Sequence, residues 1–551
     1  MLQANPSILP LFRAMRPSLW LPALLAVLAG PAGPAAGQLG RAREELRLGL
    51  EAVARGDTAG ALAALERAIA LEPELAEAHF QRGQIYAQRS SARATDYEDR
   101  KRAQEAFELA IKYDPGNPLY LLELGKLMLK QQIRLDAERV LKRALEAAAR
   151  ADAATLAEVH YQLGVLRETQ WLRYHYRHNL PLHIAQLDAD LAADDARYVW
   201  RLLDASSYPG PDQGEFEREQ MLAHFRAALA ANPAHVGANA HLLAYLYDTG
   251  QMEEYLALAR QFVRAAPSAP EAYLALGLGL HRQAKEDEAA GAFQYALSLM
   301  KEAERRDFES IARILSKDAE KKYIQLSDEG RAEFNRRFWS HADPLFLTPA
   351  NEFWLEYAAR LAYADIRFGL PEYGIRGWDT DRGIIYVRYG PPARQATFAP
   401  STSHAGDFEA IGKITTVWSY GYEGPVFVFR QNPGYRRATF ANDFRFYAED
   451  RRAVQPVYFT APSIPVRHDL PVQTVRFRGP GGQMDVEVHA LVPLDRLGAK
   501  APVTNGEVQV GLFIQDDRAA EVERQTRKEV VELGVRARGR TESWRVSLAA
   551  D

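Results

Sequence analysis

The segment Ala61–Pro73 reads ALAALERAIALEP, and Ala103–Pro115 repeats its pattern as AQEAFELAIKYDP. Both place alanine and large apolar residues three or four positions apart, which predicts a helix with one apolar face, and both end in proline. A third copy runs from Ala223 to Pro233, and a fourth ends at Pro267. Such self-similarity is the sequence signature of stacked helical repeats.

The prolines give the period of these copies. Pro233 and Pro267 are 34 residues apart, whereas Pro73 and Pro115 are 42 apart, which predicts an insertion in the polar stretch Ser90–Tyr97. A further helix is predicted after each proline: Ala76–Gln88, Leu119–Lys130, Val236–Asp248 and Glu271–Gln283. Each carries a small residue where a neighbouring helix would touch it, namely Gly83, Gly125, Ala240 and Gly277. Gly56 and Gly250 fall in the predicted turns between helices.

Period, small residues and terminal prolines together resemble tetratricopeptide (TPR) repeats. One helix pair cannot bury its own apolar face, so each repeat covers the next and the stack becomes a solenoid. We therefore predict an all-α array over residues 41–326, with an irregular insert near 168–215. Its concave surface is expected to bind a protein or peptide partner. The alternative is that the array serves only as a spacer or as a clamp for the C-terminal half.

Length, composition and charge limit the classes of protein to which this chain can belong. The chain has 551 residues, enough for three or more folding units, with 47% hydrophobic and 25% charged residues, as in ordinary globular proteins. It has no cysteine, which excludes disulfides, thiolate metal sites and a cysteine nucleophile. A net charge of −4 without a basic stripe argues against nucleic acid as the main partner.

The first 37 residues have the pattern of a secretory signal. Arg13 and Arg16 precede the apolar run Leu19–Ala29, and Ala35–Gly37 offers small residues for cleavage before Gln38. This predicts an exported protein, periplasmic or extracellular. An uncleaved anchor is the alternative, although the run is about half the ~20 residues of a spanning helix. No later segment is apolar enough to span a membrane.

The insert begins with an aromatic and histidine-rich stretch, Trp171–His183. His175, His178 and His183 invite a zinc hypothesis, because imidazoles ligate zinc, but no acidic fourth ligand stands at a useful spacing. We expect instead that the aromatic residues pack the joint between two blocks of repeats. A patch for a partner is the remaining interpretation.

Helices and then strands are predicted after the array. A short helix covers Phe334–Ser340, and Thr348 is expected to cap a helix over Ala350–Phe368, with Pro349 at its first position and Gly369 at its end. The β-branched and aromatic run Ile384–Tyr389 predicts a strand, ended by Gly390-Pro391-Pro392.

Between the long helix and that strand lies Gly377-Trp378-Asp379-Thr380-Asp381-Arg382-Gly383. Together with Phe338-Trp339, Asp343-Pro344, Thr348-Pro349 and Asn351-Glu352, this order and spacing resemble the GWxTD domain, over about residues 331–445. The resemblance implies a bacterial protein, often with a signal peptide and helical repeats. Ser340-His341-Ala342 departs from the family, where an arginine often precedes Asp-Pro. The family has no agreed catalytic residues, so none carries over.

The loop itself has a structural interpretation first. Gly377 would permit a backbone geometry that other residues resist, and Trp378 would anchor the loop to the preceding helix. Asp379, Thr380 and Asp381 would accept hydrogen bonds in a turn, and Arg382 could pair with either carboxylate.

Two functional interpretations of the loop stay open beside it. Asp379 and Asp381 could bind Ca²⁺ with Glu352 or Asp365, although the spacing is not that of a calcium loop. Alternatively, Asp381 and a second carboxylate could form the acid–base pair of a hydrolase.

Further strands are predicted at Thr415–Tyr420, Val426–Arg430 and Ala438–Tyr447, with a polar loop at Ala399–Gly412. They should form a small antiparallel sheet on the two helices, completing an α+β unit over residues 327–460. Its dense aromatic residues suit a core; a ligand platform is the alternative. Residues 461–551 show period-two alternation, which predicts a β-sandwich of five or six strands, or a truncated one.

No phosphate-binding glycine loop, His-Glu-x-x-His or Gly-x-Ser-x-Gly motif is present. We therefore expect a non-catalytic, exported TPR scaffold for protein–protein interaction in the cell envelope, without cofactor or metal. The alternative is an exported hydrolase that acts on envelope polymers through carboxylates of the GWxTD domain.

Overall fold

The computed structural model describes residues 34–92, 97–131, 133–148, 152–176, 197, 199–200, 203, 214–342, 350–370, 374–400, 412–422, 424–432, 438–440, 471–478, 484–492, 504–515, 521–533 and 540–548. Nearly all of the predicted signal segment lies outside them, and the predicted cleavage point falls within the first helix, α2 (Pro34–Ala54). Among the described helices, none combines the length and the apolar character needed to cross a membrane.

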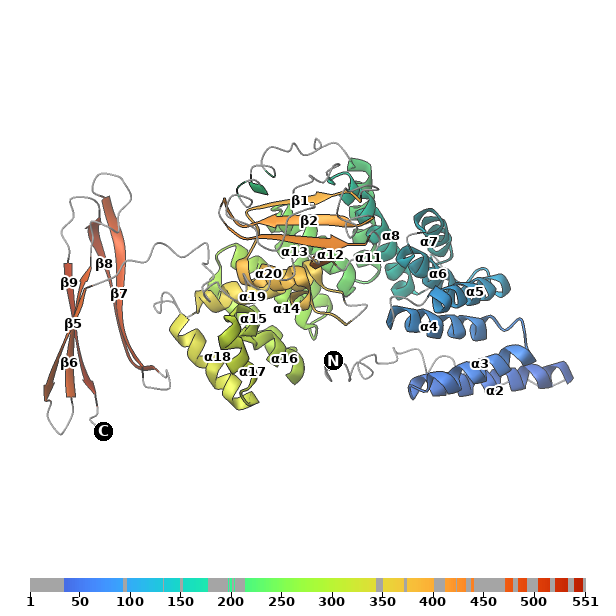
Figure 1. Cartoon of the computed structure of the whole chain (residues 1–551), viewed down its shortest axis with the longest axis horizontal. Helices are drawn as coiled ribbons and strands as arrows, with labels where there is room; N and C mark the ends of the chain where they lie inside the picture. The colour runs from blue at the N-terminus through green and yellow to red at the C-terminus, as the bar shows by residue number, and fades with distance from the viewer. Residues whose placement is uncertain are drawn as a thin grey trace, which may run out of the picture.

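Paired helices make up the N-terminal half, coloured blue to green in Figure 1. The pairs are α2 with α3 (Thr58–Leu71), α4 (Ala76–Ala92) with α5 (Tyr97–Tyr113), α6 (Pro118–Lys130) with α7 (Arg134–Ala148), α8 (Ala153–Arg173) with α11 (Glu215–Ala231), α12 (Val236–Asp248) with α13 (Met252–Ala265), and α14 (Pro270–Arg282) with α15 (Glu286–Leu299). The helices predicted after the four prolines are therefore present, and Gly56 and Gly250 turn the chain with φ of 77° and 74°.

The first helix of each pair lies on the inner side of the array. In the part of the chain that the structure describes, α4 contacts α6, α6 contacts α8, and α12 contacts α14, whereas the second helices of successive pairs contact one another less. Helices on the concave side of a curved stack lie closer together than those on the convex side. The inner surface is therefore built from α4, α6, α8, α12 and α14.

Beyond the array the chain forms α16 (Glu302–Glu309), the 3₁₀ turn η1 (Ile311–Ile314), α17 (Lys317–Ile324), α18 (Asp328–Ala342) and α19 (Glu352–Phe368). The sequence-based cap of α19 was wrong. Asn351 caps this helix, because its Oδ1 accepts a hydrogen bond from the backbone N–H of Trp354 at 2.9 Å. The predicted cap, Thr348, lies outside the described residues.

The predicted strand Ile384–Tyr389 is also wrong, because this segment belongs to helix α20 (Asp381–Tyr389). Thr380 caps α20 by accepting a hydrogen bond from the N–H of Gly383 at 3.1 Å, and Gly390 ends it with φ of 77°. Ile385 and Val387 are buried in the core. Tertiary packing of this apolar face has overridden the β-propensity of its residues.

A four-stranded antiparallel sheet comes next, in the order β1 (Arg394–Phe398), β2 (Ile414–Ser419), β3 (Val426–Gln431) and β4 (Ala438–Phe440). The antiparallel sheet was predicted, but β1 was not. The aromatic face of the sheet packs on α19 and α20. The ring of Trp418, on β2, lies 5.8 Å from that of Phe368, on α19. Residues 401–411 and 441–447, part of the predicted loop and third strand, lie outside the described residues.

The described residues of the insert reach this sheet. The guanidinium of Arg394, on β1, lies 3.7 Å from the ring centre of Trp200 and donates a hydrogen bond to its carbonyl at 3.1 Å. Trp171 packs at the predicted joint, with its ring 5.7 Å from that of Tyr245 on α12.

The C-terminal region consists of antiparallel sheets, drawn at the left of Figure 1. One has the order β5 (Val472–Arg478), β6 (Met484–Val492) and β9 (Arg540–Leu548), and the other pairs β7 (Thr504–Gln515) with β8 (Glu521–Leu533). A complete sandwich remains a prediction.

One hydrophobic core joins the later repeats to the segment after them. Its buried residues run from Met221 on α11 to Ala438 on β4. The boundary predicted at residue 327 therefore falls inside a single packed unit. Separate clusters support the earlier repeats, one between Phe80 and Leu163 and one between Leu46 and Ile85.

Candidate functional site

Glycines mark equivalent positions on the inner helices. A Cβ atom at Gly83, Gly125, Gly164 or Gly277 would lie only 2.5–2.7 Å from a side chain of the partner helix, so each glycine marks the same contact point in its repeat. The 34-residue period places Leu243 at this point in α12, so the predicted contact residue Ala240 was wrong; Ala240 is only partly buried. Equivalent positions along the inner surface can then be compared from repeat to repeat.

The residues two before and one after this contact point lie on the inner surface. In the earlier repeats they are mostly polar and only partly buried: Gln81 and Gln84 on α4, Glu123 and Lys126 on α6, and Gln162 and Val165 on α8. Among the described elements, α4 and α6 make extensive contacts only with neighbouring repeat helices. We call these six residues the open inner face.

In the later repeats the same positions are buried: the polar His241 and Ala244 on α12, and Ala275 and Leu278 on α14. His241 meets Glu168 on α8 at 2.7 Å, and the other three residues are small or apolar. Helix α19 packs on α12, α14 and α15, and its buried residues Ala358, Leu361 and Ala362 belong to the hydrophobic core that it shares with these helices. We call this part the filled inner face, because the chain's own helix occupies it.

Polar contacts hold α19 in that position. Glu356 on α19 meets Nε2 of His281, on α14, at 3.0 Å. Tyr363 donates a hydrogen bond to Asp248 at 2.9 Å, and Arg367 pairs with the same carboxylate at 3.2 Å. These bonds link α19 to the ends of both α12 and α14, so the helix is an integral part of the array.

A glutamate recurs six positions before the contact point, as Glu77, Glu158 and Glu271. Each meets a hydrogen-bond donor from the structure that comes next along the stack. Tyr120, on α6, donates to Glu77 at 2.8 Å, and His235, before α12, lies 3.0 Å from Glu158. For Glu271 the donor is Arg376 at 3.1 Å, which comes from the loop before Gly377 rather than from another repeat.

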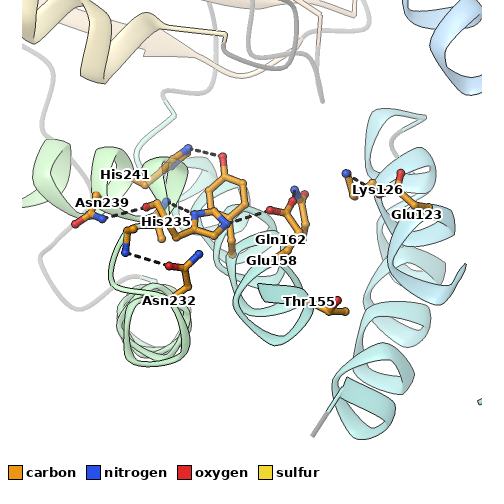
Figure 2. Close-up of polar contacts among 12 residues, drawn as sticks. Glu123, Lys126, Thr155, Glu158, Gln162, Asn232, His235, Asn239 and His241 are labelled. Carbon is orange, nitrogen blue, oxygen red and sulfur yellow. Dashed lines mark hydrogen bonds and ion pairs between the residues drawn. The ribbon is translucent and has the colours of Figure 1, made fainter. Parts of the chain in front are cut away.

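Figure 2 shows the central member of this series. Gln162 donates to Glu158 at 2.8 Å from the same helix, and Lys126 faces it from α6. Burial opposes the charge of Glu158, but the bond from His235, the charge of Lys126 and the bond from Gln162 outweigh it and lower the pKa of Glu158 to about 2. Glu158 is therefore a charged group shared by three repeats.

The loop around Gly377 forms a 3₁₀ turn, η3 (Gly377–Asp379), that packs against α19 and α20. Trp378 is fully buried, and its Nε1–H donates to Asp307 on α16 at 2.7 Å. The ring of Phe308 meets the indole edge-on at 5.5 Å, and the guanidinium of Arg376 lies 4.4 Å from its centre. Trp378 thus contacts the helix after the repeats.

The two aspartates of the loop have different partners. Asp379 pairs with Arg313 on η1 at 2.7 Å, whereas Asp381 accepts a hydrogen bond from the backbone N–H of Phe440 on β4 at 2.7 Å. Burial raises the pKa of Asp379, and the charge of Arg313 opposes this rise. Arg382 lies over the ring of Phe368 at 5.0 Å. Asp379, Asp381 and Arg382 thus each contact a different element.

The expected reason for Gly377 was wrong. Its φ is not positive; instead, a Cβ atom there would lie 1.9 Å from the carbonyl oxygen of Ala364 on α19. Gly383 is similarly close to the carbonyl of Gly377. Both glycines are needed because backbone approaches backbone, and not for conformational freedom.

Sequence reasoning missed Arg376, which stands directly before the glycine. Its guanidinium pairs with Asp365 on α19 at 2.8 Å and with Glu304 on α16 at 2.9 Å, in addition to Glu271. Burial raises the pKa of Asp365 to about 6, against the charge of Arg376 and the hydrogen bond from the N–H of Gly377. The sequence offered one sign of this role, because Arg376 stands directly before the Gly377–Gly383 loop.

The candidate calcium ligands do not come together. Among the described residues there is no group of three His, Asp or Glu side chains that could hold a metal ion. Asp379 and Asp381 point to different partners, and Glu352 is buried at the start of α19. The ring of His175 meets the carbonyl of Trp171 at 3.2 Å, while His178 and His183 lie outside the described residues.

Residues 49–89 match the family described as "TPR repeat". No curated protein matches the chain. Among solved structures, PilF of Pseudomonas aeruginosa is 16% identical with a TM-score of 0.33, over 46% of this chain and 90% of that chain. PilW, titled a widely conserved type IV pilus biogenesis factor, is 15% identical with a TM-score of 0.30, over 47% and 90%.

YrrB, titled a TPR protein with an unusual peptide-binding site, is 14% identical with a TM-score of 0.25, over 44% of this chain and 95% of that chain. Similarity at this level carries no argument about what this chain binds. Residues 49–89 therefore match a TPR repeat, and the later helices continue the same paired arrangement with the same glycine contacts.

Proposed function

We propose that this chain is an exported, non-catalytic scaffold of the bacterial cell envelope, and that it binds a protein or peptide on the open inner face of its TPR array. The segment after the array would be a GWxTD domain, as its sequence pattern suggests. Its role in this proposal is to fill and close the later repeats, so that binding is restricted to the earlier ones.

The split of the inner surface carries the proposal. The same positions are mostly polar and partly exposed on α4, α6 and α8, but buried on α12 and α14, the two helices on which α19 packs. Had the array been only a clamp, its earlier repeats would have no element to hold among the described residues. TPR arrays generally use such concave surfaces for proteins or peptides.

The hydrolase alternative receives less support from the geometry. An acid–base pair needs two carboxylates that face one substrate bond. Asp379 is engaged by Arg313 and Asp381 by the backbone of β4, so the two serve different contacts. Their bonds suit a loop that fastens the array to the sheet.

Capture from envelope extracts tests the binding surface. The full chain is compared with a variant that carries Gln84→Arg, Lys126→Glu and Val165→Arg on the open inner face. We expect a protein held by the unaltered chain and released by the variant. The control is Gln104→Arg on α5, a second helix, which should retain the same protein.

If the unaltered chain and the triple variant captured the protein equally well, the binding surface would lie elsewhere and the proposal would be contradicted. Hydrolysis of an envelope polymer that disappears in Asp381→Asn, while the fold is retained, would instead favour the enzyme.

Export has its own measurement. N-terminal sequencing of the protein recovered from the producing cells should give Gln38, and fractionation should place it outside the cytoplasm. An intact Met1 on a protein found only in the cytoplasm would remove the export component and leave the binding component standing.

A further inference from the structure

The outer surface of the first repeat differs from that of the second. Helix α3 is the second helix of the first pair, and α5 holds the same place in the next pair (Figure 1). Their positions can be compared because Leu65 on α3 faces Gly49 as Phe107 on α5 faces Gly83. Three positions that are polar on α5 are apolar on α3: Lys101, Gln104 and Glu105 are replaced by Ala59, Leu62 and Ala63.

These apolar residues share one side of α3 with a glutamate. The spacing of three and four residues places Ala59, Leu62, Ala63 and Glu66 on the same side of the helix. Leu62 is half-buried and the other three are exposed. Among the described elements, α3 makes extensive contacts only with α2 and α4. We call these four residues the outer face of α3.

A cleft of about 530 Å³ lies over this face, lined by Thr58, the four residues of the outer face and Arg89 of α4. Helix α4 has 17 residues, whereas α6, α12 and α14 have 13. The longer spacing between Pro73 and Pro115 therefore includes an added turn at the end of α4. Arg89 lies in this turn and forms one wall of the cleft.

Arg89 is held in place from the side of α5. Its Nε pairs with Asp99 at 3.0 Å, and the side chain of Asp99 is buried. The guanidinium also lies 5.8 Å from the ring centre of Tyr86. Within the described residues its terminal nitrogens have no further ion pair, and the side chain remains 47% exposed. The guanidinium can therefore bind a second carboxylate at the cleft.

Glu66 lies toward the opposite end of the cleft. The short connection 72–75 makes α3 and α4 antiparallel, so Arg89, near the end of α4, lies by the start of α3. Glu66 is eight residues after Thr58, which begins α3, and this is about 12 Å along an α-helix. The cleft thus has a positive charge at one end and a negative charge toward the other.

We propose that the outer face of α3 binds the same face of a second copy of this chain, in a dimer with two-fold symmetry. A two-fold axis perpendicular to α3 makes the two helices antiparallel. Glu66 of each copy then meets Arg89 of the other, which gives two reciprocal ion pairs. A parallel arrangement would instead set like charges against each other, so the charges select the two-fold one.

The residues between these charges suit the contact of two helices. The small side chains of Ala59 and Ala63 let the helices approach closely, and Leu62 supplies the largest apolar side chain of the face. Removing this apolar surface from water drives the association. Exposed ion pairs contribute little affinity, but they fix the orientation of the partners. We therefore expect a weak dimer of defined geometry.

The dimer leaves the open inner face available. No residue of the open inner face belongs to the outer face of α3 or lines the cleft. One dimer therefore carries two open inner faces, and a partner with two binding segments gains avidity from it. The dimer does not depend on the proposed function, so the two can fail separately.

Sedimentation velocity of the full chain over a range of concentrations tests the interface. We expect a reversible equilibrium between monomer and dimer. Ala63→Arg places a charge in the middle of the contact and should abolish the dimer. The matched control is Gln104→Arg, which adds the same charge to α5 and should dimerise as the unaltered chain does.

An exchange of charges gives a stricter test. Glu66→Arg and Arg89→Glu should each weaken the dimer by about tenfold or more, because like charges then meet at both ends. An equimolar mixture of the two variants should dimerise again, since each arginine faces a glutamate in the mixed dimer. Circular dichroism verifies the fold of Arg89→Glu, which brings a second acid to Asp99. Ala63→Arg and Glu66→Arg change exposed positions and test the interface without it.

The outcomes are distinct. A chain that stays monomeric at every concentration would overturn the proposal, and so would a dimer that Ala63→Arg and Glu66→Arg leave intact. Folded single variants that fail to associate when they are mixed would exclude the reciprocal ion pairs. Loss of the dimer in each variant alone, with recovery in the mixture, is the result expected of a two-fold interface through α3.

Discussion

At the scale of single residues, Gly377 acts through the space it leaves. The carbonyl of Ala364 occupies the position that a side chain would need, at 1.9 Å from an added Cβ atom. Since both groups belong to backbones held by helix α19 and by η3, neither can move without displacing an element. The buried indole of Trp378 is the next residue in the chain, so its position depends on this approach.

Gly377→Ala should therefore destabilise the protein by about 3 kcal/mol or more, beyond ordinary overpacking of a core. Chemical denaturation followed by tryptophan fluorescence measures this. Gly291→Ala, on α15 with no atom within 4 Å of the added Cβ, is the control. It should stabilise by about 0.5–1 kcal/mol, because alanine loses less entropy than glycine in a helix. Equal effects of the two would disprove the close-approach argument.

Asp365 gives a pH-dependent effect at the same scale. Its pKa is about 6 in the folded state against 3.8 in the unfolded state, so the folded state binds the proton more tightly. Stability from this group is present at low pH and is lost as pH rises from about 4 to about 6. Asp365→Asn retains the acceptor for Gly377 and removes the titration.

The stability of Asp365→Asn relative to the native chain should rise by about 3 kcal/mol between pH 4 and pH 7, from a shift of roughly two pKa units. Urea unfolding at both pH values measures it. A difference that stays constant across this range would show that Arg376 compensates the buried charge fully.

At the scale of elements, the joint between α8 and α11 contains two histidines in contact. Nδ1 of His160 and Nδ1 of His224 lie 3.1 Å apart. Burial lowers both pKa values; that of His224 falls to about 4, and the charges of His160, Arg167 and Lys142 contribute to this. Glu138 on α7 acts in the opposite sense. The contact between α8 and α11 therefore favours the neutral form of both imidazoles.

The contribution of His224 is fully present above pH 6.5 and is lost as pH falls toward 4. His224→Gln should make the stability less sensitive to acid. Between pH 7 and pH 4.5 the variant should lose about 2 kcal/mol less of its free energy of unfolding than the native chain. Denaturant unfolding at these two pH values checks it, with His175→Gln near the end of α8 as the control. Unchanged acid sensitivity in His224→Gln would exclude the pair as its source.

Elements also show how far the sequence could lead. The repeat helices were predictable because glycine, alanine and proline recur at equivalent positions of the repeats, with prolines 34 or 42 residues apart. Helix α20 was not, because Ile384–Tyr389 favours a strand locally and becomes helical through the Thr380 cap and the core beneath it. Strand β1 carries no distinctive alternation, and its partner β2 supplies the register.

The contacts of the loop around Gly377 lay beyond prediction for a similar reason. Asp307, Arg313 and Glu271 stand 60 to 110 residues earlier and carry no pattern that pairs them with the loop. Only the fold brings them to Trp378, Asp379 and Arg376. The division of the inner surface was present in the sequence, as glutamines giving way to alanine and leucine, but its meaning required the position of α19.

At the scale of the whole molecule, the core that runs from α11 to β4 makes the later repeats dependent on the helices and strands C-terminal to them. A chain ended at residue 326 lacks α19, which packs on α12, α14 and α15. We expect it to aggregate or to melt well below the full chain, whereas a chain ended at residue 470 should match it. Thermal unfolding and size-exclusion chromatography decide this. A stable, monomeric chain ended at 326 would contradict the shared core.

Arg376 has a further consequence for the growth of the array. In each earlier case the glutamate that precedes the contact point is met by the next repeat, but at Glu271 the arginine of the loop already occupies that place. A duplicated repeat could be inserted among the earlier pairs and find its neighbours. One added after α15 would compete with Arg376 for Glu271 and with α19 for the inner surface. Gene duplication can therefore lengthen this solenoid only from within or from its N-terminal end.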